Sequence, residues 1–266
     1  MNTETLRNYH THTTRCLHAR NTDEEYVRAA LDSGFTTLGF SDHTPWPYHD
    51  GYVSRIRMPA EQLAEYVESI RWLEKIYEGK IQLYVGLECE AFPQYYGWLK
   101  EQKEALGLDY LILGNHLSDE KEEGHFFLQS TRPDQVKQYT DMTLAGMESG
   151  LFTYLAHPEV VLSNYPVFDA ACVNMSEQIC RRALELHMPL EYNLQGNHYR
   201  AIGNYHGVGY PTTCFWEIAA RMGNEAIIGV DAHNAEMMTW SKRFQAARQY
   251  LEGLGLKVLD QLPGMP

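Results

Sequence analysis

The sequence predicts an α/β fold in which parallel strands close into a barrel, and three observations support this. Short apolar runs alternate with longer amphipathic segments, as in βα units built on a mainly parallel sheet. The length of 266 residues suits one α/β barrel. Most of the apolar runs end in a side chain that could bind a metal ion, and in a parallel barrel those ends share one rim. We therefore expect a single barrel domain over residues 1–266.

Composition narrows the class of protein. The chain is 44% hydrophobic, but it contains no apolar run of about 18 residues, so we expect no membrane span. The first residues do not resemble a secretory signal, and the five cysteines are scattered, which favours a reduced, cytoplasmic setting. A net charge of −13 without a Lys/Arg cluster argues against binding of long nucleic acid. The sequence does not indicate an oligomeric state.

In the first half of the chain, four strands are expected to alternate with three helices. Thr22 and Glu25 form a capping box for a helix that ends near Gly34. The segment 118–131 is polar and contains glycine, which is typical of a mobile loop over a site. The expected strands cover 6–10, 36–40, 81–87 and 110–113, and the two later helices cover about 60–78 and a segment ending near 106.

The second half continues the alternation with three more strands. These cover 152–156, 189–193 and 226–230. Helices are expected at about 133–149, at about 170–187, in a segment ending near Gly223, and at about 240–252, before a short tail. Residues 195–211 contain four glycines and a proline, so we expect a long loop there.

Side chains able to bind metal recur at the ends of the strands. His10 and His12 are two residues apart, so at a strand end they point to one face, and His18 follows on the next loop. The later strands end in His43, Glu88, His116, His157, and the pair Asp231 and His233. This mixed nitrogen and oxygen set suits Zn²⁺, Mn²⁺ or Fe²⁺, and it is too large for one tetrahedral ion, so two or three ions are expected. For Cys16, a small buried thiol is favoured over a ligand.

Six short motifs stand in the order found in a known family. They are His10-Thr11-His12, Ser41-Asp42-His43, Gly86-Leu87-Glu88, Gly114-Asn115-His116, Ala156-His157-Pro158 and Asp231-Ala232-His233. With these motifs the chain resembles the PHP (polymerase and histidinol phosphatase) family, close to its histidinol-phosphate phosphatase branch. The resemblance implies a distorted (β/α)₇ TIM-like barrel with three metal ions. His10, His12, Glu88 and Asp231 would hold one ion; Glu88, His116 and His157 a second; His18, His43 and His233 the third.

The resemblance also implies a reaction, the hydrolysis of a phosphomonoester by a hydroxide that bridges two metal ions. Glu88, Asp231 and His233 are the expected catalytic residues. The favoured substrate is L-histidinol phosphate, which would place the enzyme in histidine biosynthesis. Two alternatives remain: a phosphoesterase of this family acting on another small ester or a nucleotide, and a non-catalytic metal-binding module.

The residues that would contact the substrate are expected after the sixth strand, where the chain resembles the substrate loop of the phosphatase branch. Arg200 could bind the phosphate through two hydrogen bonds, although a solvated loop arginine is the alternative. The further candidates are Asn193, His198 and His206. Arg15 and Arg20 are weaker candidates, and the second arginine expected in this branch is not assigned. We expect Asp42 and Glu90 to orient neighbouring ligands rather than to bind metal.

Overall fold

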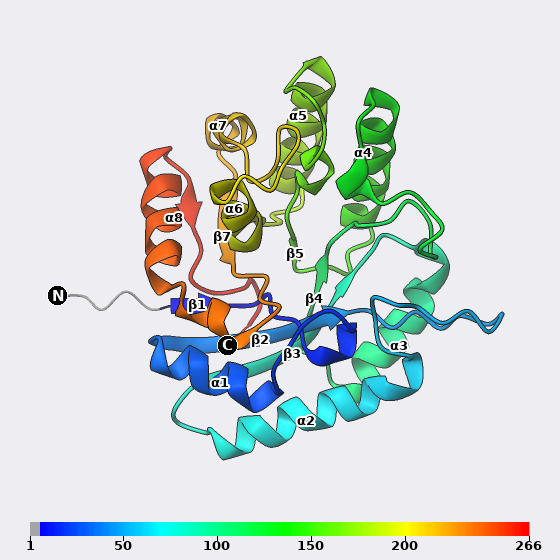
Figure 1. The fold of residues 1–266 in the computed structure, drawn as a ribbon, viewed down its shortest axis with the longest axis vertical. Coiled ribbons are helices and arrows are strands. Elements are labelled where there is room, and N and C mark those ends of the chain that lie inside the picture. Colours follow the sequence, from blue (N-terminus) through cyan, green and yellow to red (C-terminus); the bar gives the residue numbers. More distant parts are fainter. Residues whose placement is uncertain (1–5, 266) are drawn as a thin grey trace.

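The computed structural model describes residues 6–265 and contains one sheet of eight parallel strands in sequence order. The sheet curls strongly, and most of the helices lie on its outer side (Figure 1). The strands are β1 (Leu6–Asn8), β2 (Phe35–His43), β3 (Gln82–Cys89), β4 (Tyr110–Leu113), β5 (Tyr154–Leu155), β6 (Leu190–Asn193), β7 (Glu225–Gly229) and β8 (Lys257–Val258). The α-helices are α1 (Asp23–Asp32), α2 (Leu63–Ile76), α3 (Tyr96–Leu106), α4 (Pro133–Glu148), α5 (Ala170–Glu185), α6 (Leu194–Ala201), α7 (Thr213–Met222) and α8 (Ser241–Gly253).

Hydrophobic packing fixes which face of each strand points inward. On β3, the side chains of Val85, Leu87 and Cys89 belong to the large core beneath the helices. The alternating residues Tyr84 and Glu88 face the other way, because successive side chains on a strand point to opposite faces. This alternation places the Glu88 carboxylate inside the curl, at the carboxyl end of the strand.

A smaller core of aromatic residues fills the inside of the curl below the strand ends. It contains Tyr9, Tyr84, Tyr110, Ile112, Tyr154, Ala156, Ile227 and Leu262. The Tyr110 hydroxyl donates to the carbonyl of Tyr9 at 2.7 Å, so its polar end is satisfied in the core. A Cβ at Gly86 would lie 2.5 Å from the Tyr110 carbonyl oxygen, so this strand can approach its neighbour only with glycine.

The ring closes between the first and last thirds of the chain. Thr11 and Ala232 form a parallel bridge, and the His12 amide donates to the Ala232 carbonyl at 2.9 Å. At the opposite end of β7, β8 adds a short pairing, with Glu225 beside Lys257. The predicted distorted barrel is thus confirmed, and the seven predicted strands correspond to β1–β7.

Two elements differ from the expectations. The tail contains an eighth strand, β8. Only two of its residues pair with β7, and a strand this short has no recognisable sequence pattern. The segment 195–211 is not wholly a loop, because its first part is helix α6. Asn193 starts this helix by accepting a hydrogen bond from the Gly196 amide at 2.8 Å. Gly196 was one reason to expect a loop, because glycine is a poor helix former. Glycine is needed at this position because a Cβ would lie 2.4 Å from Cε2 of Tyr210.

Two loops project from the rim at the carboxyl ends of the strands. The one around residue 50 extends away from the body (Figure 1). The 118–131 segment folds back on itself, with an antiparallel bridge between Leu117 and Phe126 and a short 3₁₀ helix at Phe127–Gln129. Within residues 6–265, no helix has both the length and the apolar composition required to cross a bilayer.

Candidate metal centre and active site

Four side chains on the inner rim form a close, buried polar group. They come from three elements: His10 and His12 follow β1, Glu88 ends β3, and Asp231 follows β7. The Nε2 atoms of His10 and His12 are 3.2 Å apart, and His12 Nε2 is 3.1 Å from Asp231 Oδ1. Glu88 Oε1 lies 3.5 Å from His10 Nε2, and Glu88 Oε2 lies 3.5 Å from His12 Nε2.

These spacings match what one bound cation requires. Zinc binds nitrogen and oxygen at about 2.0–2.2 Å, which separates the ligand atoms of a tetrahedral site by roughly 3.3–3.6 Å. The group is buried, with His10 and His12 at 0% exposure and Glu88 at 1%. The donor set therefore fits a divalent ion in both chemistry and spacing.

Glu88 also belongs to a second group. Its Oε1 atom lies 2.7 Å from His157 Nε2 and 3.7 Å from His116 Nε2, while Oε2 lies 3.0 Å from His43 Nδ1. One carboxylate thus faces imidazoles from four strands, as a bridging ligand would.

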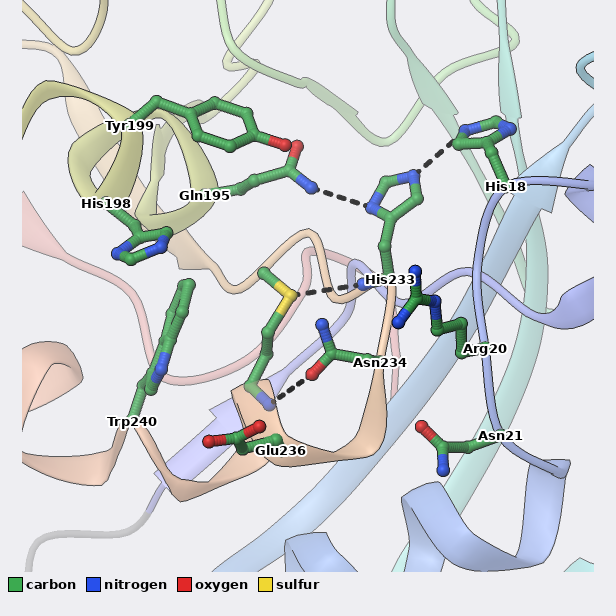
Figure 2. A pocket seen from close by; sticks show the side chains of 11 residues that line it. His18, Arg20, Asn21, Gln195, His198, Tyr199, His233, Asn234, Glu236 and Trp240 are labelled. Atoms are coloured by element: carbon green, nitrogen blue, oxygen red, sulfur yellow. Dashed lines mark hydrogen bonds between the residues drawn. The ribbon is translucent and has the colours of Figure 1, made fainter. Parts of the chain in front are cut away.

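His18 and His233 form a third group at the outer edge of the cluster. Their Nε2 atoms are 3.2 Å apart (Figure 2). His18 Nδ1 is 2.7 Å from the carbonyl of Cys16, and a carbonyl can only accept, so the hydrogen sits on Nδ1. The lone pair of His18 therefore points from Nε2 at His233. His43 completes a further trio with His12 and His233, whose ligand atoms all lie within 4.8 Å of one another.

Three further buried carboxylates lie beside these rings, and one of them fixes the orientation of His10. Glu191 Oε1 lies 2.7 Å from His10 Nδ1, so that nitrogen donates to it and Nε2 is left to face the cluster. Asp42 lies 3.6 Å from His12 Nδ1, and Glu90 lies 3.8 Å from His116 Nδ1. Glu90 is itself paired with buried Arg57 at 2.9 Å. Asp42 and Glu90 lie beside these rings but beyond hydrogen-bond distance, so the orienting role expected for them stays a prediction.

The pKa values of the clustered histidines shift in both directions. Glu88 is fully buried, which favours the neutral acid, but the neighbouring histidines outweigh burial and hold its pKa well below its ordinary range. Burial and the charge of His12 lower the pKa of His233 to about 3. For His10 and His12 burial acts the same way, but the neighbouring carboxylates outweigh it and raise both pKa values, that of His12 to about 9. Cations bind ionised carboxylates and neutral imidazoles, so a cation bound here would displace protons from His10 and His12.

Several polar atoms of the cluster have no hydrogen-bond partner among the described residues. They include Glu88 Oε2 and the Nδ1 atoms of His12, His116 and His157. An unsatisfied buried polar group costs about 1–3 kcal/mol, so a protein retains several only where another partner compensates. A bound cation supplies that compensation for the carboxylate oxygen directly.

Two hollows open from the cluster. One, of about 380 Å³, has Glu88, His116 and Asp231 in its floor and Phe126, Leu128 and Tyr210 among its walls. The other, of about 680 Å³, lies beyond His18 and His233 (Figure 2). The predicted loop 118–131 therefore does lie over the site.

The model of the PHP domain matches residues 8–193 of this sequence. The chain belongs to the PHP domain family. The matched span contains seven of the nine clustered side chains, and the fold adds Asp231 and His233 from outside it.

Individual relatives and solved structures agree with this assignment. The chain is 28% identical to a probable histidinol-phosphatase of Deinococcus radiodurans over 244 residues, which cover 84% of this chain and 85% of that protein. It is 30% identical to the histidinol-phosphatase of Bacillus subtilis over 124 residues, 45% of this chain and 44% of that protein. A crystal structure of histidinol phosphate phosphatase from Lactococcus lactis, complexed with zinc, L-histidinol and phosphate, superposes with a TM-score of 0.72 at 19% identity, covering 95% of each chain.

In this PHP domain, the predicted metal ligands lie together, but most of the predicted substrate residues do not line the hollows. All nine predicted ligands meet at the rim. Asn193 does not line either hollow: its amide donates to Glu191 at 3.1 Å and to Asp231 at 3.0 Å, which makes it a support for the cluster. His206 is exposed and lies outside both hollows, whereas His198 lines the larger one.

Arg200 also lies outside both hollows, contrary to the expectation that it faces the site. Its Nε donates to the Pro211 carbonyl at 2.9 Å and its Nη2 to the Val208 carbonyl at 2.7 Å. The physical reason is helix α6, which turns Arg200 toward the following loop and away from the cluster.

Three residues that contact the site were not predicted from the sequence. Glu191 is a buried carboxylate on β6. It precedes Asn193 by two residues, and residues two apart on a strand share a face, so the sequence could have indicated that both point toward the site. Gln195 and Tyr199 both line the two hollows, and Gln195 Nε2 lies 2.9 Å from His233 Nδ1. Their spacing of four residues places them on one face of a helix, but that signal is visible only once α6 is known.

Proposed function

We propose that this PHP domain is a metal-dependent phosphatase that hydrolyses L-histidinol phosphate to L-histidinol and phosphate. The observation that carries the proposal is the spacing of His10, His12, Glu88 and Asp231, whose ligand atoms lie 3.1–3.6 Å apart in a buried rim site. The choice of substrate follows the Deinococcus and Bacillus relatives, which are named as histidinol-phosphatases, and the Lactococcus structure, which contains L-histidinol and phosphate.

We assign the metal ions to three groups of residues. His10, His12, Glu88 and Asp231 would hold one ion; Glu88, His116 and His157 a second; and His18, His43 and His233 a third. Cations bound there would supply Lewis acidity for the phosphoryl oxygens and lower the pKa of water at the site. Zinc, manganese and iron all suit the mixed donor set.

The chain's own residues would set up the reaction around those ions. Glu191 holds His10 in the tautomer whose Nε2 faces the cluster. Asn193 donates to Asp231 Oδ2 and leaves Oδ1 turned toward His12. The apolar walls formed by Phe126, Leu128 and Tyr210 reduce the access of bulk water to the floor of the smaller hollow, which strengthens electrostatic interactions there.

The test is phosphate release from a panel of esters by protein stripped of metal and then loaded with Zn²⁺, Mn²⁺ or Fe²⁺. We expect L-histidinol phosphate to have the highest kcat/KM, and His116→Ala to abolish turnover while the protein stays folded. Preference for nucleotides would instead indicate a phosphoesterase of another specificity. Absence of turnover on every ester with every metal would reject the enzyme.

A further inference from the structure

The larger hollow carries unpaired charges of both signs. His18 and His233 stand at one end, and Arg20, Glu236 and Trp240 line its walls (Figure 2). Its volume of about 680 Å³ is ample for a small phosphate ester. The hollow adjoins the cluster, so a ligand that reaches the metal-binding groups there would contact these walls.

Arg20 has a fixed backbone and a free side chain. Its amide donates to the His233 carbonyl at 2.8 Å, and the next residue, Asn21, accepts a hydrogen bond from the Ala235 amide at 3.0 Å. The guanidinium makes no hydrogen bond or ion pair with any residue in the range 6–265. A bidentate donor thus stands beside the cluster without an internal partner.

Other arginines near the rim already have partners within the protein. Arg15 forms ion pairs with Asp23 at 3.0 Å and with Glu65 at 2.8 Å. Arg57 is buried against Glu90, and Arg200 donates to two carbonyls of its own loop. The arginine that is both on the wall and available for a phosphate is therefore Arg20.

Glu236 provides the opposite charge in the same hollow. It lies in the 3₁₀ helix Ala235–Thr239, which Asn234 caps by accepting from the Met237 amide at 3.2 Å. Within the described chain its carboxylate has no ion-pair partner. Figure 2 shows Glu236 and Trp240 on the side of the hollow away from His18. The Trp240 ring packs on His198 with centroids 5.0 Å apart, which gives this end an aromatic wall.

We propose that Arg20 and Glu236 make this hollow selective for a phosphate ester whose alcohol portion carries a positive charge. Arg20 binds a phosphoryl oxygen beside the cluster, and Glu236 binds the cationic nitrogen at the other end. This inference rests on the proposed function, because the cluster determines which end receives the phosphate. A neutral ester would use Arg20 but not Glu236.

Two substrates separate the two roles. We would measure kcat/KM for L-histidinol phosphate, which carries an ammonium group, and for 4-nitrophenyl phosphate, which has no cation. The variants are Arg20→Gln and Glu236→Gln, with Arg181→Gln on α5 and Glu217→Gln on α7 as matched controls at exposed positions outside the hollow. Metal content of each protein is measured in parallel.

Glu236→Gln should lower kcat/KM for L-histidinol phosphate roughly threefold to fivefold and leave 4-nitrophenyl phosphate unchanged, since the contact is partly solvated. Arg20→Gln should lower both values about tenfold and weaken inhibition by inorganic phosphate to a similar degree. Equal effects of Glu236→Gln on both substrates, or no effect on either, would overturn the role of Glu236. An unchanged inhibition constant for phosphate in Arg20→Gln would overturn the role of Arg20.

Binding measurements keep this inference separate from the proposed function. Calorimetry of the metal-loaded proteins with inorganic phosphate and with L-histidinol does not require turnover. If the wild-type protein hydrolyses neither ester, the proposed function fails. In that case weaker phosphate binding in Arg20→Gln and weaker histidinol binding in Glu236→Gln still support the charge-selective hollow, and unchanged affinities reject it.

Discussion

At the scale of single residues, Glu191 and Asn193 stand on one face of β6 and reach two of the clustered side chains. Glu191 contacts His10 Nδ1 at 2.7 Å and also accepts from the His157 amide at 3.1 Å. Supporting carboxylates of this kind fix the tautomer and raise the basicity of a ligating imidazole. Such residues come from a strand that contributes none of the nine predicted ligands.

Glu191→Gln should lower the metal affinity of the protein by about 10–100-fold, because an amide supports the His10 imidazole less strongly than a carboxylate. Competition with a fluorescent chelator measures this affinity. The Glu217→Gln variant is the control for a lost surface charge. Equal affinities of Glu191→Gln and the wild-type protein would mean that Glu191 only packs the interior.

Gly114 provides a second test at this scale. A Cβ at this position would lie 2.1 Å from Glu88 Oε1, so Gly114→Ala must displace the carboxylate that faces five imidazoles. We expect loss of bound metal, measured by elemental analysis of the purified protein. Gly97→Ala on α3 is the matched control, because its Cβ meets nothing within 4 Å. The control should retain its metal and gain about 0.5–1 kcal/mol of stability from its helical position.

At the scale of elements, α6 shows where the sequence was insufficient. The capping box of Thr22 and Glu25 is local, and the structure confirms it at the start of α1. The start of α6 depends on Asn193, whose position is fixed by β6 and by Asp231. A short segment containing Gly196 has weak helical propensity, so tertiary contacts decide its conformation.

Arg200 holds α6 to the loop that follows it, and this predicts the effect of its removal. Arg200→Gln should increase hydrogen exchange of amides in residues 194–211, because two side-chain hydrogen bonds to carbonyls are lost. Mass spectrometry of peptides from this region measures the exchange. If exchange stays the same and only inhibition by inorganic phosphate weakens, Arg200 binds phosphate as the sequence predicted.

The two projecting loops form another element-scale contact that depends on pH. Glu122 accepts from the Ser54 hydroxyl at 2.5 Å and from the Arg55 amide at 2.8 Å. Burial favours the neutral acid, but these hydrogen bonds outweigh it and lower the pKa of Glu122 below its ordinary value of 4.5. A lowered pKa means that the contact stabilises the loops above about pH 4.5 and weakens as pH falls through the pKa in the folded state.

This pH dependence is measurable at the loops themselves. Hydrogen exchange of residues 51–56 and 118–124 should rise below pH 4.5 relative to the rest of the molecule, after correction for intrinsic exchange rates. In Glu122→Gln the change across this pH range should disappear. A response that is identical in the variant would assign it to another group.

At the scale of the whole molecule, the cluster joins residues from opposite ends of the chain. The motifs at the ends of successive strands predicted this meeting, because a parallel barrel brings those ends to one rim. Sequence alone did not reveal β8, since two paired residues carry no periodic signal. It also placed Arg200 wrongly, since the direction of that side chain depends on a helix created by packing.

Metal removal should therefore destabilise the entire barrel rather than one loop. A cation present at 100 times its dissociation constant stabilises the folded state by about 2.7 kcal/mol, which corresponds to roughly 5–10 °C in Tm for a chain of this size. Differential scanning calorimetry with and without a chelator measures the shift. An unchanged Tm in a protein that is shown to have lost its metal would contradict a cation shared by distant strands.

The closure of the ring has a consequence for synthesis on the ribosome. The Asn8 side chain accepts from the Val230 amide at 2.8 Å, and these residues are 222 positions apart. At about 5–20 residues per second, the N-terminal imidazoles emerge roughly 10–45 seconds before the aspartate that completes their set. During that interval the nascent chain can hold a cation only loosely, so the choice of metal is made after translation has passed β7.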